Sequence, residues 1–458
     1  MSVPESDISQ DLGAGLSPSA KALLQVLARM ELGEETEVFQ ENPDTRNLSM
    51  MVSTFRGSLP SALQRRLAGL PGVGRFSTIT QNDLISLVTE LWADNLSRFS
   101  GTEIAVLKAY AETPSVSLND LATKMHMSYP QARRAYKRLR DSGVLQVRGL
   151  LNIDQYGIER MLLALKSPSL AISGPYVEKS LFIDGPSPSA YLVTAHPTER
   201  KEEFLQLVKT LRSAADGVSL WHLSKGKVGF SDAYLHPGRG QWKLDSLQFR
   251  LACRGGGDSI VLGESTSPPA GAPNPTPAEL PIIDQLRMNY ECTAAEVVAS
   301  TGVSESTAFR KCRELRESGL VEPRAQIAIP NLTEHVLAVV SPSAADDVVR
   351  AWKALPVTYV TKIRNIENPA ENRILLIAAL PRGTSRDLVS ILHSEFSRAD
   401  NYVAQIVSAG TESFVSTAAM FDRKSRSWRW SQGDFFDVRS YGVVRNEAET
   451  SKVPIDLA

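Results

Sequence analysis

The sequence predicts an α+β protein built from one unit of about 150 residues that occurs twice. Residues 117–148 align without a gap onto residues 293–324, and eight of the 32 compared positions are identical. A later stretch of each unit, beginning at Pro197 and Pro381, matches at a constant offset of 184 residues. Within each copy the pattern changes from helical periodicity to short apolar alternations typical of strands, and this change predicts the fold class.

The composition is that of an ordinary globular protein, with 42% hydrophobic and 22% charged residues and a net charge of −1 over 458 residues. Any nucleic-acid surface must therefore be local. Three scattered cysteines and six histidines without metal-binding spacing favour neither a disulfide framework nor a metal site. The longest apolar run, Ile374–Leu380, is far shorter than the roughly 20 residues of a membrane span, and the first ten residues show no signal-peptide pattern. We expect a cytoplasmic protein without metal, cofactor or membrane contact.

The first half of each unit contains three short helical patterns followed by an alternating segment. Capping-box spacings open the second helix at Ser117 and Thr293, because side chains at those positions satisfy backbone donors at a helix start. The third helix begins after Ser128 or Ser304 and ends at a glycine in both copies. The alternating segments at 144–153 and 320–329 are predicted to form small hairpins. This order predicts winged helix-turn-helix modules at 101–153 and 279–331.

The third helix of each module has an apolar face for packing and a basic face suited to the major groove of double-stranded DNA. Arginines on such a face can bind phosphates or guanine edges. The candidate DNA-binding residues of the first module are Ser128, Tyr129, Gln131, Arg133, Arg134, Lys137, Arg138 and Arg148. Those of the second module are Ser304, Ser306, Thr307, Arg310, Lys311, Arg313 and Arg324.

Charge distinguishes the two modules. Residues 101–152 contain eight Lys/Arg and four Asp/Glu, a net charge of +4, whereas residues 279–330 contain six and eight, a net charge of −2. Since nonspecific affinity for DNA rises with the number of phosphates neutralised, the first module should bind DNA more strongly. Whether the second module binds DNA or only packs against the rest of the chain is left open by the sequence.

The second half of each unit is predicted to be a ferredoxin-like domain. In the last unit, 334–445, the patterns follow the order βαββαβ, which gives an antiparallel sheet. The middle unit, 158–250, keeps the strands, but its first helix is replaced by AISGPYVE, so one side of its sheet should be uncovered. LLALKSPS (162–169) and VLAVVSPS (336–343) match across the two domains after a two-residue gap.

Three segments lie outside the two complete units. Residues 14–97 are interpreted as a degenerate α/β domain, because SPSA and ENP recur there in the same order as in the last unit, and Arg56-Gly57 matches Arg382-Gly383 at the same offset of 326 residues as ENP. Residues 254–278 are rich in proline and lack periodicity, so we expect a linker. Residues 446–458 are expected to form a flexible tail.

With SYPQARRAYKRLRDSGVLQ and SESTAFRKCRELRESGLVE each followed by the βαββαβ pattern, the chain resembles the Lrp/AsnC family of transcription regulators, particularly archaeal-type members. The resemblance covers about three quarters of the chain. It implies ACT/RAM-like α/β domains that mediate dimerisation and sense a small molecule such as an amino acid. The chain departs from the family in carrying two units plus a half-unit, so it is expected to form a pseudo-dimer within one chain or a homodimer.

Two other interpretations remain open at the level of sequence. Proteins of the same two-domain build include siroheme decarboxylases, which use histidines near a tetrapyrrole, and His196 and His222 are predicted to lie on neighbouring strands. The second alternative is a non-catalytic scaffold whose winged modules bind protein instead of DNA. The preferred interpretation is a DNA-binding transcription regulator that is not an enzyme.

Overall fold

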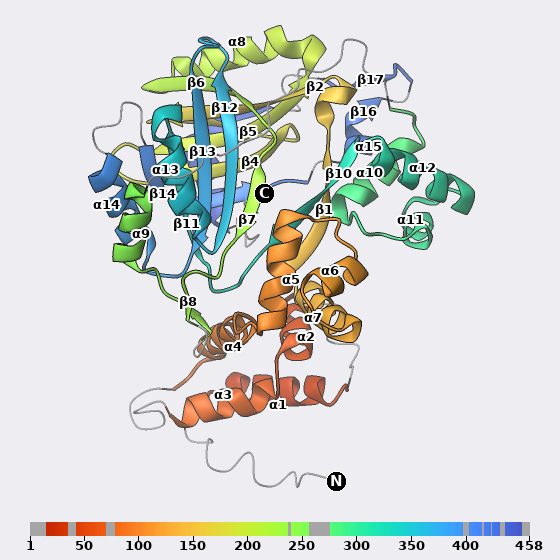
Figure 1. Cartoon of the computed structure of the whole chain (residues 1–458), viewed down its shortest axis with the longest axis vertical. Coiled ribbons are helices and arrows are strands. Elements are labelled where there is room, and N and C mark those ends of the chain that lie inside the picture. Colours follow the sequence, from red (N-terminus) through yellow and green to blue (C-terminus); the bar gives the residue numbers. More distant parts are fainter. Residues whose placement is uncertain are drawn as a thin grey trace.

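The computed structural model describes residues 15–34, 43–69, 78–236, 240–255, 275–396, 403–414, 416–422, 424–430 and 436–450. It has the mixed helical and sheet composition expected of an α+β protein (Figure 1). The N-terminal helices form one end of the molecule and a large sheet forms the other; helices α5–α7 (residues 101–141) lie between them, and helices α10–α12 (residues 279–317) lie beside the sheet. Within the described ranges, no helix has the length and apolar character needed to cross a membrane. Most of the expected linker at 254–278 lies outside the described residues.

The N-terminal region is a group of helices, so the expected α/β domain at 14–97 is wrong. The helices are α1 (Pro18–Glu31), α2 (Pro43–Thr54), α3 (Leu59–Ala68) and α4 (Gln81–Leu96). They bury a core that includes Leu27, Leu63 and Val88. The repeated SPSA sequence marks a helix start, because Ser17 precedes α1 as its N-cap and Ser341 has the same place before α13 (Pro342–Lys353).

Each module consists of three helices followed by a single strand. The first contains α5 (Gly101–Glu112), α6 (Leu118–Lys124), α7 (Tyr129–Asp141) and β1 (Leu145–Leu151); the second contains α10 (Glu279–Met288), α11 (Ala294–Thr301), α12 (Glu305–Glu317) and β10 (Val321–Ile327). The capping residues Ser117 and Thr293 accept hydrogen bonds as predicted. The turns before α7 and α12 place His126 and Gly302 at positive φ, 51° and 71°, which the glycine adopts without steric cost.

The expected hairpin after each third helix is wrong. The two strands β1 and β10 pair antiparallel with each other, which places Arg148 opposite Arg324 (Figure 1). An alternating pattern shows that a strand is present but not which strand it pairs with. Here the partner strand lies in the other copy of the repeat, so the pairing joins the two modules.

The second halves form two four-stranded arrays within one ten-stranded sheet. The last unit has β11 (Glu334–Val340), α13, β12 (Val357–Asn365), β13 (Asn372–Leu380), α14 (Ser385–Phe396) and β14 (Val403–Val407), the predicted βαββαβ order. The middle unit has β2 (Ile158–Lys166), β3 (Leu170–Ser173), β4 (Val177–Ile183), β5 (Ser189–Pro197), α8 (Lys201–Arg212) and β6 (Gly217–Leu223), with no helix between β2 and β4. The spatial orders are β14-β11-β13-β12 and β6-β2-β5-β4, and β12 pairs with β6.

The structural register corrects the sequence match in the first strand of these arrays. Leu163 lies opposite Leu192, and Ala338 lies opposite Leu376. Since residues 192 and 376 are related by the offset of 184, residues 163 and 338 are equivalent. The first strands therefore correspond at an offset of 175, one residue more than LLALKSPS and VLAVVSPS suggest. A one-residue slip would place every side chain on the wrong face of the sheet.

Each unit extends past its last strand and packs on the other unit. From the first unit, β7 (Lys227–Phe230) pairs with β12, and α9 (Ser246–Arg254) packs beside α13 and α14 with Phe249 and Cys253 in their core. From the second, β15 (Ala409–Glu412) pairs with β4, and β18 (Asp437–Ser440) pairs with β3. The remaining elements are η2 (Ile153–Tyr156), η3 (Thr198–Arg200), β8 (Leu235–His236), β9 (Gln241–Trp242), α15 (Thr417–Met420), β16 (Phe421–Asp422) and β17 (Ser427–Trp428).

The C-terminal helix α17 (Tyr441–Thr450) covers the region where the middle unit lacks a helix. Tyr441 packs edge-on against Phe182, and Val444 and Ala448 are buried in the same core. The expectation of an uncovered sheet face is therefore wrong, because the covering helix comes from the far end of the chain. The expected flexible tail at 446–458 is helical as far as Thr450, and residues 451–458 lie outside the described residues.

Candidate nucleic-acid interface and an arginine-lined cavity

Helix α7 has the two faces that the sequence predicts. Its apolar face, Ala132, Ala135, Tyr136 and Leu139, is buried against α5 and α6. On the outer face Arg133, Arg134, Lys137 and Arg140 are exposed, and so is Tyr129 at the start of the helix. Among the described residues, none of these four basic side chains makes an ion pair with a carboxylate. The N-cap is a box in which Gln131 Oε1 accepts from the backbone N–H of Ser128 at 3.0 Å, so these two candidates stabilise the helix start.

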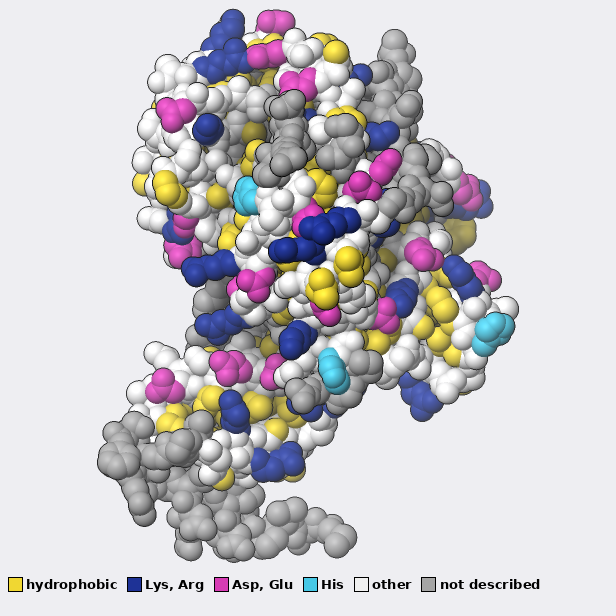
Figure 2. Space-filling view, turned by 60° about the vertical axis from the view of Figure 1, so that its left-hand side comes forward, with side chains coloured by type: hydrophobic (Ala, Val, Ile, Leu, Met, Phe, Trp, Pro, Cys, Tyr) yellow, Lys and Arg dark blue, Asp and Glu magenta, His cyan; other side chains and the backbone are white. Residues whose placement is uncertain are grey.

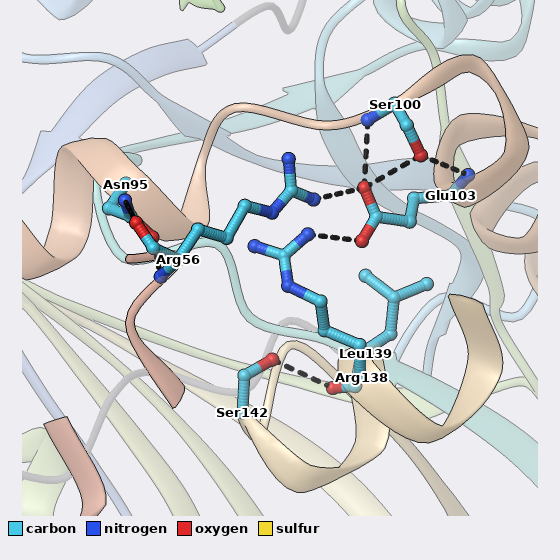
Figure 3. Close-up of polar contacts among 7 residues, drawn as sticks. All are labelled: Arg56, Asn95, Ser100, Glu103, Arg138, Leu139 and Ser142. Atoms are coloured by element: carbon cyan, nitrogen blue, oxygen red, sulfur yellow. Dashed lines mark hydrogen bonds and ion pairs between the residues drawn. The ribbon is translucent and has the colours of Figure 1, made fainter. Parts of the chain in front are cut away.

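Arg138 points into the protein instead of outward from α7. It forms an ion pair with Glu103 of α5, and Arg56 from the N-terminal helices binds the other oxygen of the same carboxylate (Figure 3). Glu103 is only 3% exposed and also accepts from the backbone N–H of Ser100 at 2.7 Å. Arg138 therefore ties α7 to α5 and to the N-terminal helices, a role that places it outside the exposed basic face.

The basic side chains of α12 are bound within the second module. Arg310 lies 3.5 Å from Glu314 and Arg313 lies 3.7 Å from Glu317, while Lys311 binds Glu279 at 2.8 Å and Glu314 at 2.7 Å. The hydrogen bonds that Lys311 donates to Glu279 and Glu314 raise the pKa of its ammonium group. At the position equivalent to Arg133, α12 carries Phe309, which is 63% exposed. The candidate DNA-binding residues at the start of α12 hydrogen-bond with one another: Ser304 Oγ lies 2.8 Å from Thr307 Oγ1 and 3.3 Å from Ser306 Oγ.

The two arginines that were expected in DNA-contacting wings line a cavity that is partly open to solvent. This cavity has a volume of about 470 Å³ and lies between the β1–β10 pair and the large sheet. Six basic residues line it, against two acidic residues. They are Arg148, Arg160, Lys179, Lys225, Arg287 and Arg324, with Glu178 and Glu412.

Several of these charged groups are held by neighbours. Arg160 binds Glu178 through two hydrogen bonds of 2.7 and 3.2 Å. Burial raises the pKa of Glu178, but Arg160, Arg287 and Lys179 together outweigh burial and hold the pKa below its usual value. The guanidinium of Arg324 lies 5.3 Å from the ring centre of Tyr359, and that of Arg287 lies 4.7 Å from the ring of Phe414. Burial lowers the pKa of Arg287.

The two histidines proposed for tetrapyrrole chemistry lie on β5 and β6, which are not neighbours as predicted but are separated by β2, and they do not line the cavity. His222 Nε2 is 3.0 Å and His196 Nε2 is 3.7 Å from Glu159, which also binds Lys201 at 3.2 Å. Glu159 and Arg160 are adjacent in a strand and so point to opposite faces, with Arg160 in the cavity. Burial lowers the pKa of His196 to about 4, so its ring is neutral near pH 7.

Sequence reasoning missed the cavity because its walls come from both units. The only local signal was the pair Arg148 and Arg324 at equivalent positions of the repeat. Within the part of the chain that the structure describes, no group of three or more His, Cys, Asp or Glu side chains is arranged to hold a metal ion. Figure 2 shows basic and acidic side chains interspersed over one face of the molecule, as expected for a nearly neutral chain.

Comparison with known proteins gives little beyond the geometry. No protein-family model matches the chain, and no curated protein matches it. Among solved structures, crystal structures of the siroheme decarboxylase NirDL, one of them in co-complex with an iron-uroporphyrin III analogue, are similar to this chain. In both, the sequence identity is 12% and the TM-score is 0.39, over 69% of this chain and 94% of that chain.

Proposed function

We propose that this chain is a transcription regulator that binds double-stranded DNA through α7. In this proposal each three-helix module is a winged helix-turn-helix, and the α/β domains are ferredoxin-like. The observation that carries it is the exposed basic face of α7, on which Arg133, Arg134 and Lys137 have no carboxylate partner among the described residues. A paired arginine must lose its protein partner before it can bind phosphate, so unpaired ones are better placed to do so.

The shape of α7 suits the major groove. The helix has 13 residues, so it is about 20 Å long. Tyr129, Arg133 and Lys137 recur every four residues along one stripe, and Arg134 lies beside them. Such a stripe follows the groove, where arginines bind guanine edges or phosphates and the lysine binds phosphate.

The second module acts in this proposal as a partner of the first and not as a second reader. Its basic side chains neutralise its own carboxylates, and its net charge is −2. One chain then presents one reader, so its preferred DNA sequence is a single asymmetric half-site. Selection from random duplexes should return one such half-site, whereas a palindrome would show that a second reader takes part.

The decisive experiment compares Arg133→Ala/Arg134→Ala/Lys137→Ala with the control Arg310→Ala/Lys311→Ala/Arg313→Ala on α12, which removes the same charge. DNA affinity is measured by fluorescence anisotropy between low and moderate salt concentrations. For the α7 variant, the slope of log affinity against log salt should fall by about 2–3, because each phosphate contact contributes about 0.9. Affinity should fall more than about tenfold, and the control should change little. An α7 variant with the wild-type affinity and slope would remove the basis of the proposal.

A further inference from the structure

We propose that the arginine-lined cavity is a binding site for a small organic polyanion bearing two or more carboxylate or phosphate groups. This site is separate from the α7 surface and does not depend on DNA binding. Three independent features of the described cavity carry the proposal: its facing like charges, an unsatisfied buried donor, and its size.

The first feature is a pair of like charges held together by the backbone. Antiparallel pairing of β1 and β10 places Arg148 directly opposite Arg324, and both side chains line the cavity. Like charges directly opposite each other on neighbouring strands are destabilising. An anion between the two guanidinium groups would turn this repulsion into two attractive contacts. Guanidinium forks also match carboxylate and phosphate oxygens in geometry.

The second feature is a buried donor that lacks a partner. Nε of Arg324 is buried and makes no hydrogen bond within the described structure. A buried donor without an acceptor costs free energy, so such groups in a folded protein call for an explanation. An oxygen atom of an anion in the cavity would accept this bond. The same guanidinium lies over the ring of Tyr359, and this cation–π contact helps to orient it.

The third feature is the balance of size and charge. A volume of about 470 Å³ lies within the usual range for small-molecule sites. Glu178 is bound by Arg160, and Lys225 pairs with Glu322 on β10. Arg287 lies 3.7 Å from Asp284. Even when Glu322 and Asp284 are added to Glu178 and Glu412, the six basic side chains of the lining outnumber these four carboxylates, an excess of positive charge that suits a ligand with two negative charges.

The cavity also reaches the segment that follows α7. Gly143, which ends that helix, and Gln146 of β1 belong to its lining. An anion bound there touches the connection between the proposed DNA-binding helix and the rest of the molecule. A change in DNA affinity on ligand binding would rest on the proposed function, whereas ligand binding itself does not.

The test is isothermal titration calorimetry of the full chain with two probes, inorganic pyrophosphate for phosphate groups and citrate for carboxylates. The variant Arg148→Gln/Arg324→Gln removes the facing pair, and Arg65→Gln/Arg66→Gln on the exposed side of α3 removes the same charge elsewhere. At least one probe should bind the wild type. Its affinity for the cavity variant should be about tenfold or more lower, and its affinity for the α3 control should be unchanged. Binding of one probe and not the other identifies the anionic group.

Two results would overturn the site: neither probe binds the wild type at millimolar concentration, or the cavity variant binds as tightly as the wild type. Circular dichroism establishes that the variants are folded. If the double glutamine variant does not fold, Arg324→Lys is titrated in its place, because it keeps the charge and loses the fork, and weaker binding is again expected. All of these measurements omit DNA, so they stand apart from the test of α7.

Discussion

The two helical modules of this chain share their architecture and differ in how their charges are used. Both have capped second and third helices joined by a tight turn with positive φ. In α7 the outward basic residues face solvent without carboxylate partners among the described residues, whereas in α12 they pair along the same helix. A repeat can therefore keep the residues that shape a fold while the positions that face outward diverge, and function must be judged from the latter.

The same difference appears at the first helix of each module. Glu103 and Glu279 are equivalent positions, and each helps to cap its helix start. Glu103 is almost completely buried and binds Arg56 and Arg138, as Figure 3 shows. Glu279 forms its ion pair with Lys311 at 2.8 Å. One position thus anchors the N-terminal helices in the first module and makes an ordinary ion pair in the second.

The largest effect is expected from Glu103→Gln. Glutamine keeps the capping geometry but leaves two arginines beside a neutral group, so the first module should lose about 2–4 kcal/mol of stability. Glu279→Gln should cost about 1 kcal/mol, because Lys311 keeps Glu314 as a partner. Hydrogen exchange of the α5 and α10 amides measures each module separately, which global unfolding of a multidomain chain does not. Equal protection losses in the two variants would remove the distinction.

Sequence patterns predicted what depends on neighbouring residues. The caps at Ser117 and Thr293 and the buried face of α7 follow from local spacing, and the structure has them all. The βαββαβ order of the last unit followed for the same reason. Short sequence matches misled where they carried no periodicity, as SPSA did for the N-terminal helices.

Features that depend on residues far apart in the sequence could not be predicted from local patterns. The partner strand of β1 lies in the other unit, and Arg56, which shares Glu103 with Arg138, lies between α2 and α3 in the N-terminal region. Arg138 and Arg148 looked like DNA contacts because nothing nearby shows which carboxylate or cavity attracts a basic side chain. The α17 helix, which covers the middle unit, also comes from the far end of the chain.

The two α/β domains also differ in the ionisable groups that surround equivalent positions. Glu159 and Glu334 are equivalent, but Glu159 faces His196, His222 and Lys201, whereas Glu334 accepts from the backbone N–H groups of Gly383, Thr384 and Ser385. His196 is fully buried and stacks on Phe204, with ring centres 4.4 Å apart. Neither of its nitrogens has a hydrogen-bond partner within the described structure.

His196 should make the first unit sensitive to acid. Its pKa is about 4 in the folded protein and about 6.5 in an unfolded chain, so between these values the unfolded state binds the extra proton. The contribution of neutral His196 to the free energy of unfolding is therefore fully present above about pH 6.5, and about 2–3 kcal/mol of it is lost as the pH drops to 4. His196→Phe should keep the stacking and remove this loss, as measured by thermal unfolding across that range.

His335 provides the comparison for this variant. Burial lowers its pKa to about 4 as well, so the second unit keeps its own acid sensitivity when His196 is replaced. About half of the total loss should then persist in His196→Phe, and hydrogen exchange should place what remains in β11 and its neighbours. An unchanged pH profile in the variant would show that His196 does not set it.

A smaller effect is expected from releasing the basic residues of α12. Glu314→Gln/Glu317→Gln removes the carboxylates that hold Arg310 and Arg313, and it changes the net charge of residues 279–330 from −2 to 0. If ion pairing is what keeps α12 from DNA, affinity at low salt should rise about threefold to tenfold and the salt slope should steepen by about 1. Glu199→Gln/Glu202→Gln, before and within α8, gives the same charge change away from the helix. An equal gain in that control would assign the effect to overall charge and not to α12.

The smallest effect concerns the direct link between the modules. The hydroxyl of Tyr136 on α7 donates to Glu291, which lies between α10 and α11, and Tyr136 stacks on Tyr110 with ring centres 5.1 Å apart. Tyr136→Phe keeps the stacking and removes the bond, so stability should fall by about 1 kcal/mol while the salt slope of DNA binding stays as in the wild type. Glu291→Gln and the double variant complete a cycle that isolates the coupling between the two residues. A coupling near zero would show that the modules are held together by the β1–β10 pairing and the shared sheet alone.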